Sequence, residues 1–225
     1  MRKWFIIYLI INISAFVCSS SADVHYDQCD SRWADELIGS TQHTICKDGD
    51  ILTSLAMTLA SLNTTTNWIR STSTVITPSS LNTWLNNSEG YLADSTIIDM
   101  TTIGNLTRRL VYNTHLSPSS FPSFNQLQDS LNSTSYLAQI DDRSSHYTYI
   151  IGVVPNDDNT KLNEIIVFDP SAVSNKPRIL PYLNVSGLIA FDNHKKNIPR
   201  QYPTYKQCDP KWGSNLMVTT TVCKV

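Results

Sequence analysis

The sequence is poor in glycine, in charge and in long hydrophobic runs. Only seven of its 225 residues are glycine and ten are proline, which excludes a collagen-like or low-complexity fibre. Charged residues make up 16%, and 17 Lys and Arg against 19 Asp and Glu leave a formal net charge of −2. We therefore expect no basic surface for a nucleic acid or an anionic membrane. With 41% hydrophobic residues, the chain can instead bury a sizeable core.

The N-terminus has the pattern of a cleaved secretory signal. Arg2 and Lys3 precede an apolar run from Trp4 to Val17, and small residues follow it through Ala22. That run has about 14 residues, whereas a membrane-spanning helix needs roughly 20. We therefore expect residues 1–22 to be a signal peptide and the mature protein to have no stable membrane anchor. Its destination is then the extracellular space or a lysosome-like compartment reached through the secretory pathway.

If the protein is secreted, its cysteines are expected to form disulfide bonds and its Asn-x-Ser/Thr sequons are candidate glycosylation sites. Four cysteines remain after the signal, an even number that is typical of disulfide bonding: Cys29, Cys46, Cys208 and Cys223. The mature chain also holds five candidate glycosylation sites: Asn63, Asn86, Asn105, Asn132 and Asn184. Because Asn, Ser and Thr are abundant, some sequons arise by chance, and we expect about three to be used.

The two ends of the mature chain contain an internal repeat. Residues 26–39 read YDQCDSRWADELIG and residues 205–218 read YKQCDPKWGSNLMV, with Tyr, Gln, Cys, Asp, Trp and Leu in register. A second pair of similar segments follows: residues 44–50 read TICKDGD and residues 221–225 read TVCKV. We interpret residues 23–202 as one complete domain and residues 203–225 as the truncated start of a second copy.

The repeat also bears on the disulfide pairing. Each copy has its own cysteine pair, 17 residues apart in the first and 15 in the second. Pairing Cys29 with Cys46 and Cys208 with Cys223 is therefore the economical choice among three connectivities. The alternative is four free, buried thiols.

Helical patterns come first in the domain. The stretch after Asp50 repeats apolar residues at a helical period up to Leu62, with Asp50 as the expected N-cap. Thr77 and Pro78 fit the N-cap and first position of a second helix, and residues 123–131 predict a third.

Strand patterns follow the helices. Five short runs rich in Ile, Val and Tyr are bounded by Asp, Asn, Pro and Gly, as antiparallel strands are: residues 136–140, 146–154, 164–168, 178–183 and 188–191. Helices followed by strands within one domain predict an α+β fold.

Several of these segments together resemble a known family. The features are Tyr-x-Gln-Cys-Asp before Trp33, Gly49 before a helix reading x-x-x-Thr-Ser-Leu-Ala-Met, His146 opening a strand and Asp169-Pro closing another. This layout, over about residues 26–192, is similar to the bacteriocin-processing branch of the papain-like cysteine peptidases. The resemblance implies a papain-like fold, with N-terminal helices packed on an antiparallel sheet. It implies no cofactor.

The resemblance also implies roles for four residues. In such a site, a Cys at a helix N-terminus becomes a thiolate beside an imidazole, an Asp or Asn orients that imidazole, and an upstream Gln donates to the oxyanion. Carried over, Gln28 is the oxyanion donor, His146 the base and Asp169 its orienter. Asp50 occupies the nucleophile position, where the family has Gly-Cys.

The Asp at position 50 changes the expected chemistry, because a carboxylate cannot form the thioester of a cysteine peptidase. Cys46, four residues upstream, is the nearest thiol, and we interpret it as half of a structural disulfide. Without the resemblance, Asp50 would be a plain N-cap, His146 a satisfied core histidine and Asp169 a strand-ending turn.

We therefore expect a catalytically degenerate peptidase homologue that binds a peptide or cell-wall material. The alternative is an active thiol hydrolase, with its nucleophile either at Cys46 or in a complete second copy. A third possibility is a metal site formed by Asp50, His146 and Asp169, whose side chains are suitable ligand types.

Overall fold

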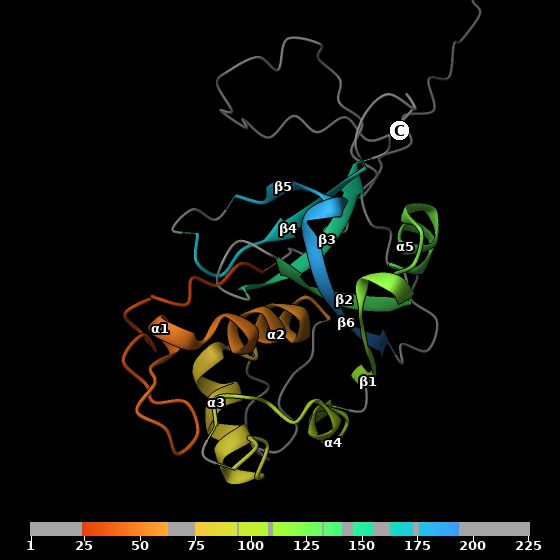
Figure 1. Ribbon diagram of the computed structural model, residues 1–225. Coiled ribbons are helices and arrows are strands. Elements are labelled where there is room, and N and C mark those ends of the chain that lie inside the picture. The colour runs from red at the N-terminus through yellow and green to blue at the C-terminus, as the bar shows by residue number, and fades with distance from the viewer. Residues whose placement is uncertain are drawn as a thin grey trace, which may run out of the picture.

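The computed structural model describes residues 24–62, 75–93, 95–107, 110–131, 133–140, 146–154, 163–172 and 176–193. Three predicted features lie outside these ranges: the signal peptide at residues 1–22, the truncated second copy at residues 203–225, and its cysteines Cys208 and Cys223. Within them, helices come mainly first and strands mainly afterwards (Figure 1). The fold is therefore α+β, as the sequence predicts.

Six strands form one antiparallel sheet in the order β1-β6-β2-β3-β4-β5. Their bounds are β1 Leu110–Leu116, β2 Thr134–Ile140, β3 His146–Val154, β4 Glu164–Phe168, β5 Arg178–Pro181 and β6 Val185–Asn193. The predicted strands at 146–154 and 164–168 are confirmed at both ends. The run 178–183 is shorter than expected, because residues Tyr182–Asn184 form a 3₁₀ turn, η3.

The helices divide between the two sides of the sheet. They are α1 Ile45–Asp48, α2 Asp50–Ser61, α3 Pro78–Asn87, α4 Ile103–Thr107 and α5 Phe124–Ser130, with 3₁₀ turns η1 Met100–Thr102 and η2 Pro118–Ser120. Helices α1 to α3 lie on one side and α5 on the other (Figure 1). No helix in the described ranges is long and apolar enough to cross a membrane.

Both faces of the sheet are covered, because alternate side chains of each strand point to opposite sides. In β2, Leu137 joins the core formed with α2 and α3, whereas Tyr136 and Ala138 join the core formed with α5. The same division holds in β6, where Phe191 faces α2 and Ala190 faces α5. Strands buried on both faces read as nearly continuous apolar runs, and this is why their sequence pattern is clear.

Helix α2 is the central helix of the domain, and every residue from Leu52 to Ser61 is buried. Two of its buried hydroxyls have partners on β3: the Ser54 hydroxyl donates to the carbonyl of Tyr147 at 3.0 Å, and the Ser61 hydroxyl lies 2.8 Å from the Tyr149 hydroxyl. These contacts, together with the apolar core, hold α2 against the first residues of β3.

The helix termini confirm one predicted cap and correct another. Thr77 caps α3, with Pro78 at its first position. Ser123 caps α5, the helix predicted over residues 123–131. Asp50, however, is the first residue of α2 rather than its N-cap, which is Gly49. Glycine is needed at that point because a Cβ there would lie 2.4 Å from the carbonyl oxygen of Ile45 in α1. The Asp50 side chain is consequently free to contact another element.

Candidate functional site

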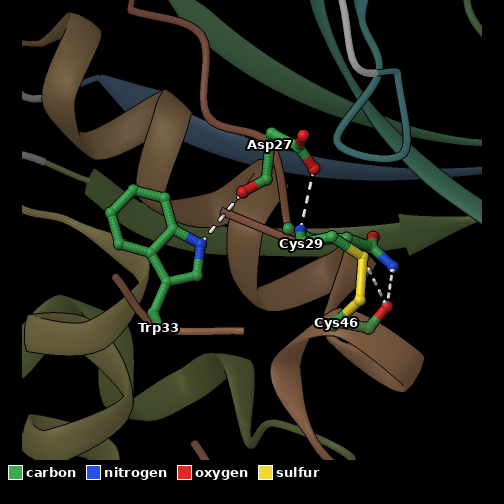
Figure 2. The surroundings of a disulfide bond; sticks show 5 residues. Asp27, Cys29, Trp33 and Cys46 are labelled. Carbon is green, nitrogen blue, oxygen red and sulfur yellow. Dashed lines mark hydrogen bonds between the residues drawn. A yellow bond between two sulfur atoms is a disulfide. The ribbon is translucent and has the colours of Figure 1, made fainter. Parts of the chain in front are cut away.

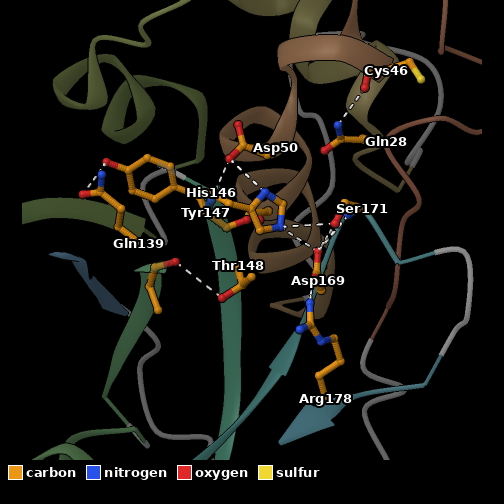
Figure 3. Close-up of polar contacts among 12 residues, drawn as sticks. Gln28, Cys46, Asp50, Gln139, His146, Tyr147, Thr148, Asp169, Ser171 and Arg178 are labelled. Carbon is orange, nitrogen blue, oxygen red and sulfur yellow. Dashed lines mark hydrogen bonds and ion pairs between the residues drawn. The ribbon is translucent and has the colours of Figure 1, made fainter. Parts of the chain in front are cut away.

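Asp50 connects the first turn of α2 to β3. The backbone N–H of Tyr147 donates to Asp50 Oδ2 at 2.6 Å, although the two residues are 97 positions apart (Figure 3). A carboxylate at a helix N-terminus is also stabilised by the helix dipole. Asp50 is thus held in position by both elements, with its side chain 19% exposed.

His146, the first residue of β3, lies between two carboxylates. Its Nδ1 is 3.3 Å from Asp50 Oδ2, and its Nε2 is 2.7 Å from Asp169 Oδ1. Carboxylate oxygens accept hydrogen bonds, so both ring nitrogens act as donors and the ring is an imidazolium. Burial alone would lower the pKa of His146, but the hydrogen bonds to Asp169 and Asp50 outweigh it and raise that pKa to about 9.

Asp169 follows β4 and is almost fully buried, with 1% of its side chain exposed. Burial works against its charged form. Hydrogen bonds from His146 and from the backbone and hydroxyl of Ser171 nevertheless hold the pKa of Asp169 well below its usual range. The second carboxylate oxygen of Asp169, Oδ2, accepts a hydrogen bond from the guanidinium of Arg178, the first residue of β5. The carboxylate is therefore fully partnered and ionised.

Sequence reasoning did not predict Ser171 or Arg178. Ser171 could have been found from its position two residues after Asp169, because an Asp side chain commonly accepts from the backbone two residues on. Arg178 had no such signal, since it reaches Asp169 only through the pairing of β4 with β5.

Gln28 lies on the far side of the site and is 8% exposed. Its backbone N–H donates to the Pro170 carbonyl at 2.8 Å, and its side-chain Nε2 donates to the Cys46 carbonyl at 2.7 Å (Figure 3). A carbonyl can only accept, so the amide nitrogen must face Cys46 and the amide oxygen must face away from it. One N–H of the expected oxyanion donor is thus already used within the protein.

The segment that carries Gln28 is fixed by a disulfide bond between Cys29 and Cys46 (Figure 2). Asp27 supports the same turn: its carboxylate accepts from the Cys29 N–H at 2.8 Å, and its carbonyl accepts from the Trp33 indole at 2.9 Å. The predicted pairing of the first two cysteines is confirmed. In this bond Cys46 has no thiolate, which argues against Cys46 as a nucleophile.

The structure thus brings together the four residues that the sequence singled out. Asp50 contacts His146, His146 contacts Asp169, and the residue after Asp169 contacts Gln28. Gln28 in turn bonds to α1, which immediately precedes Gly49 and Asp50. These contacts form a closed ring that joins α1, α2, β3 and the turn after β4.

The site has one hydroxyl that could be considered as a nucleophile. Ser171 Oγ is 3.5 Å from His146 Nε2, but the same hydroxyl donates to Asp169 Oδ1 at 2.7 Å. A protonated imidazole between two carboxylates has no lone pair with which to take the serine proton. The geometry therefore does not support a serine nucleophile.

The remaining predicted residues lie on the surface or outside the described ranges. Among the sequons, Asn86, Asn105 and Asn184 are exposed, and Asn63 and Asn132 lie outside these ranges. Within the described part of the chain, no group of three or more His, Cys, Asp or Glu is arranged to hold a metal ion. The possible metal site at Asp50, His146 and Asp169 thus has no structural support.

Comparison of the chain with protein-family models, with curated proteins and with solved structures finds no match. The functional assignment therefore depends on the sequence and on the geometry of the site.

Proposed function

We propose that this protein is a secreted homologue of papain-like cysteine peptidases that has lost covalent catalysis and binds a peptide or cell-wall material at the former active site. The observation that carries the proposal is the position of the His146 ring between two carboxylates, with Asp50 at Nδ1 and Asp169 at Nε2. A cysteine peptidase needs a nucleophile at a helix N-terminus, a base beside it and an orienting carboxylate behind the base. Here Asp50 occupies the nucleophile position.

Two features of the site oppose acyl transfer. Asp50 cannot form a thioester, and the Cys46 sulfur is in a disulfide. A fixed ionic cluster suits binding better than turnover. Secretion is supported by the N-terminal pattern and by the disulfide, which is typical of oxidising compartments.

The substitution Asp50→Cys tests the proposal directly. The new thiol would lie beside His146 at the start of α2, where an imidazolium and the helix dipole favour the thiolate. We expect the variant to be alkylated at residue 50 by iodoacetamide at about pH 6, at least about tenfold faster than an ordinary thiol with a pKa near 8.5.

The matched control is Asp48→Cys, which places a thiol in α1 two residues earlier and outside the ring of contacts. Adding His146→Gln to Asp50→Cys should remove the rate enhancement, and peptide mapping would verify that the disulfide is intact. Equal alkylation rates at positions 48 and 50 would contradict the peptidase-like arrangement. Peptide hydrolysis by the wild-type protein would contradict the loss of catalysis.

A further inference from the structure

The site around Asp50 contains more hydrogen-bond acceptors than donors. Asp50 uses Oδ2 for its bonds to Tyr147 and His146, so Oδ1 has no partner among the described residues. Gln28 Oε1 is buried and likewise has no partner there. A buried acceptor without a donor is costly, and such an atom in a native protein calls for an explanation.

The contacts of Gln28 fix the direction of this acceptor. Its Nε2 donates to the Cys46 carbonyl, and its backbone N–H donates to the Pro170 carbonyl. If the side-chain oxygen and nitrogen exchanged places, the amide oxygen would face the Cys46 carbonyl, and neither oxygen could donate. In Figure 3 the oxygen of Gln28 lies on the side of Asp50. Where a cysteine peptidase presents donors to an oxyanion, this protein presents an amide oxygen and a carboxylate.

We propose that the site binds a primary ammonium group, with Asp50 Oδ1 and Gln28 Oε1 as its acceptors. This inference rests on the proposed function, because it names the ligand class of the same site. A primary nitrogen has several N–H bonds and can bridge two acceptors, whereas a backbone amide has only one. Asp50, which is partly exposed, is the point of entry, and the Gln28 oxygen is the deeper acceptor.

The charges of the neighbouring groups balance, so a further cation at this position would be held by the remaining oxygen of Asp50. Arg178 and His146 both contact Asp169. Of these charged groups, Asp50 contacts only His146, with 3.3 Å between Asp50 Oδ2 and His146 Nδ1. The imidazolium lies on the Oδ2 side of Asp50, which leaves Oδ1 for a second positive group. A hydrogen bond between an ammonium and a carboxylate is among the stronger kinds in proteins.

The test is an NMR titration of the mature, oxidised protein at about pH 6.5, where amines are charged. Methylammonium is the first probe, and acetamide is its neutral counterpart. A probe this small binds no tighter than the low millimolar range, so the titration should extend to about 100 mM. We expect saturable shifts of the Tyr147 backbone amide and the Gln28 side-chain amide with methylammonium, and at least about tenfold weaker binding of acetamide.

Two further probes separate the possible sources of the ammonium group. Alanine amide offers only an α-amine and Nα-acetyl-lysine amide only a side-chain amine; whichever binds more tightly identifies the source. Nα-acetyl-alanine amide, which has neither, should not bind. Shifts that do not saturate, or equal binding of acetamide and methylammonium, would overturn the proposal.

The variant test uses two substitutions that each remove one negative charge. Asp50→Asn should weaken methylammonium binding about tenfold or more, because it removes the charge and turns an N–H₂ group toward Gln28. Asp48→Asn, at a carboxylate that contacts His43 at 2.6 Å outside the ring, should leave binding unchanged. Equal loss in both variants would show only a general effect of charge and would overturn the assignment.

The result of the amine-binding titration is independent of the result of the Asp50→Cys alkylation experiment. Rapid alkylation of Asp50→Cys without binding of any amine by the wild type would keep the peptidase-like framework and reject this ligand class. Amine binding without enhanced alkylation would reject the framework instead.

Discussion

The carboxylate of Asp50 accepts a hydrogen bond from the backbone N–H of Tyr147 at 2.6 Å, which joins the first residue of α2 to the second residue of β3. The same oxygen lies 3.3 Å from His146 Nδ1. One side chain therefore positions both the strand and the imidazole. This makes Asp50 a structural residue as well as the candidate ligand-binding residue.

We expect Asp50→Ala to destabilise the protein by about 1–3 kcal/mol, because it leaves the Tyr147 N–H and one His146 nitrogen without their acceptor. Asp48→Ala is the control: its carboxylate contacts His43 on an exposed part of the surface, and such pairs contribute about 0–1 kcal/mol. Urea unfolding of both variants measures the difference. Similar losses of unfolding free energy at the two positions would contradict the role assigned to Asp50.

The stability of the fold should depend on the protonation of His146. Its pKa in the folded protein is about 9, raised from 6.5. The stabilisation is therefore complete below pH 6.5, where the unfolded chain is also protonated, and is lost as the pH rises through 9. Allowing for partial exposure of the ring, we expect a loss of about 2–3 kcal/mol over this interval.

The pH prediction is checked by urea unfolding from pH 6 to 9.5 for the wild type and for His146→Gln, with the direct pKa measured by NMR titration of the imidazole. The variant should lose less stability than the wild type across that range. Below pH 4 the opposite linkage applies, since Asp169 has a lowered pKa and its contribution disappears as it becomes protonated. A His146 pKa near its ordinary value would reject the ionic cluster.

The Cys29–Cys46 disulfide should contribute about 3 kcal/mol, mainly by restricting the unfolded chain, for cysteines 17 residues apart. Replacing both cysteines with Ser should lower the free energy of unfolding by about that amount. Mass mapping of a non-reduced digest checks the bond itself. A free Cys46, or Cys29 joined to Cys208, would show that the pairing is wrong.

The proposed secretion predicts glycosylation at the exposed sequons. Asn86 in α3, Asn105 in α4 and Asn184 in η3 are all accessible on the folded surface. Expression through a eukaryotic secretory pathway should add glycans that peptide N-glycosidase removes, and Asn→Gln at each position should remove one glycan. An unmodified protein that retains residues 1–22 would contradict the predicted signal peptide.

Local sequence patterns were sufficient to predict many of the elements. Strands β3 and β4 were readable because they are buried on both faces, and α3 because Thr77 and Pro78 form a local start signal. Strand β1 was missed because it lies at the sheet edge, where Asn113 at a bulge and the exposed Val111 interrupt the apolar pattern. Helices α1 and α4 were missed because each has at most five residues.

The amino-acid sequence alone determined the α+β class, because that class depends on local periodicity and on residue type. The family resemblance singled out Gln28, Asp50, His146 and Asp169 as candidate site residues. The tertiary structure alone decided how those residues are used. It turned the Gln28 nitrogen toward Cys46, placed Arg178 on Asp169 and put His146 between two carboxylates. Such contacts join segments up to 144 residues apart, for example His25 and the Asp169 carbonyl. No local pattern encodes them, since they arise only when the packing of α2 on the sheet brings the segments together.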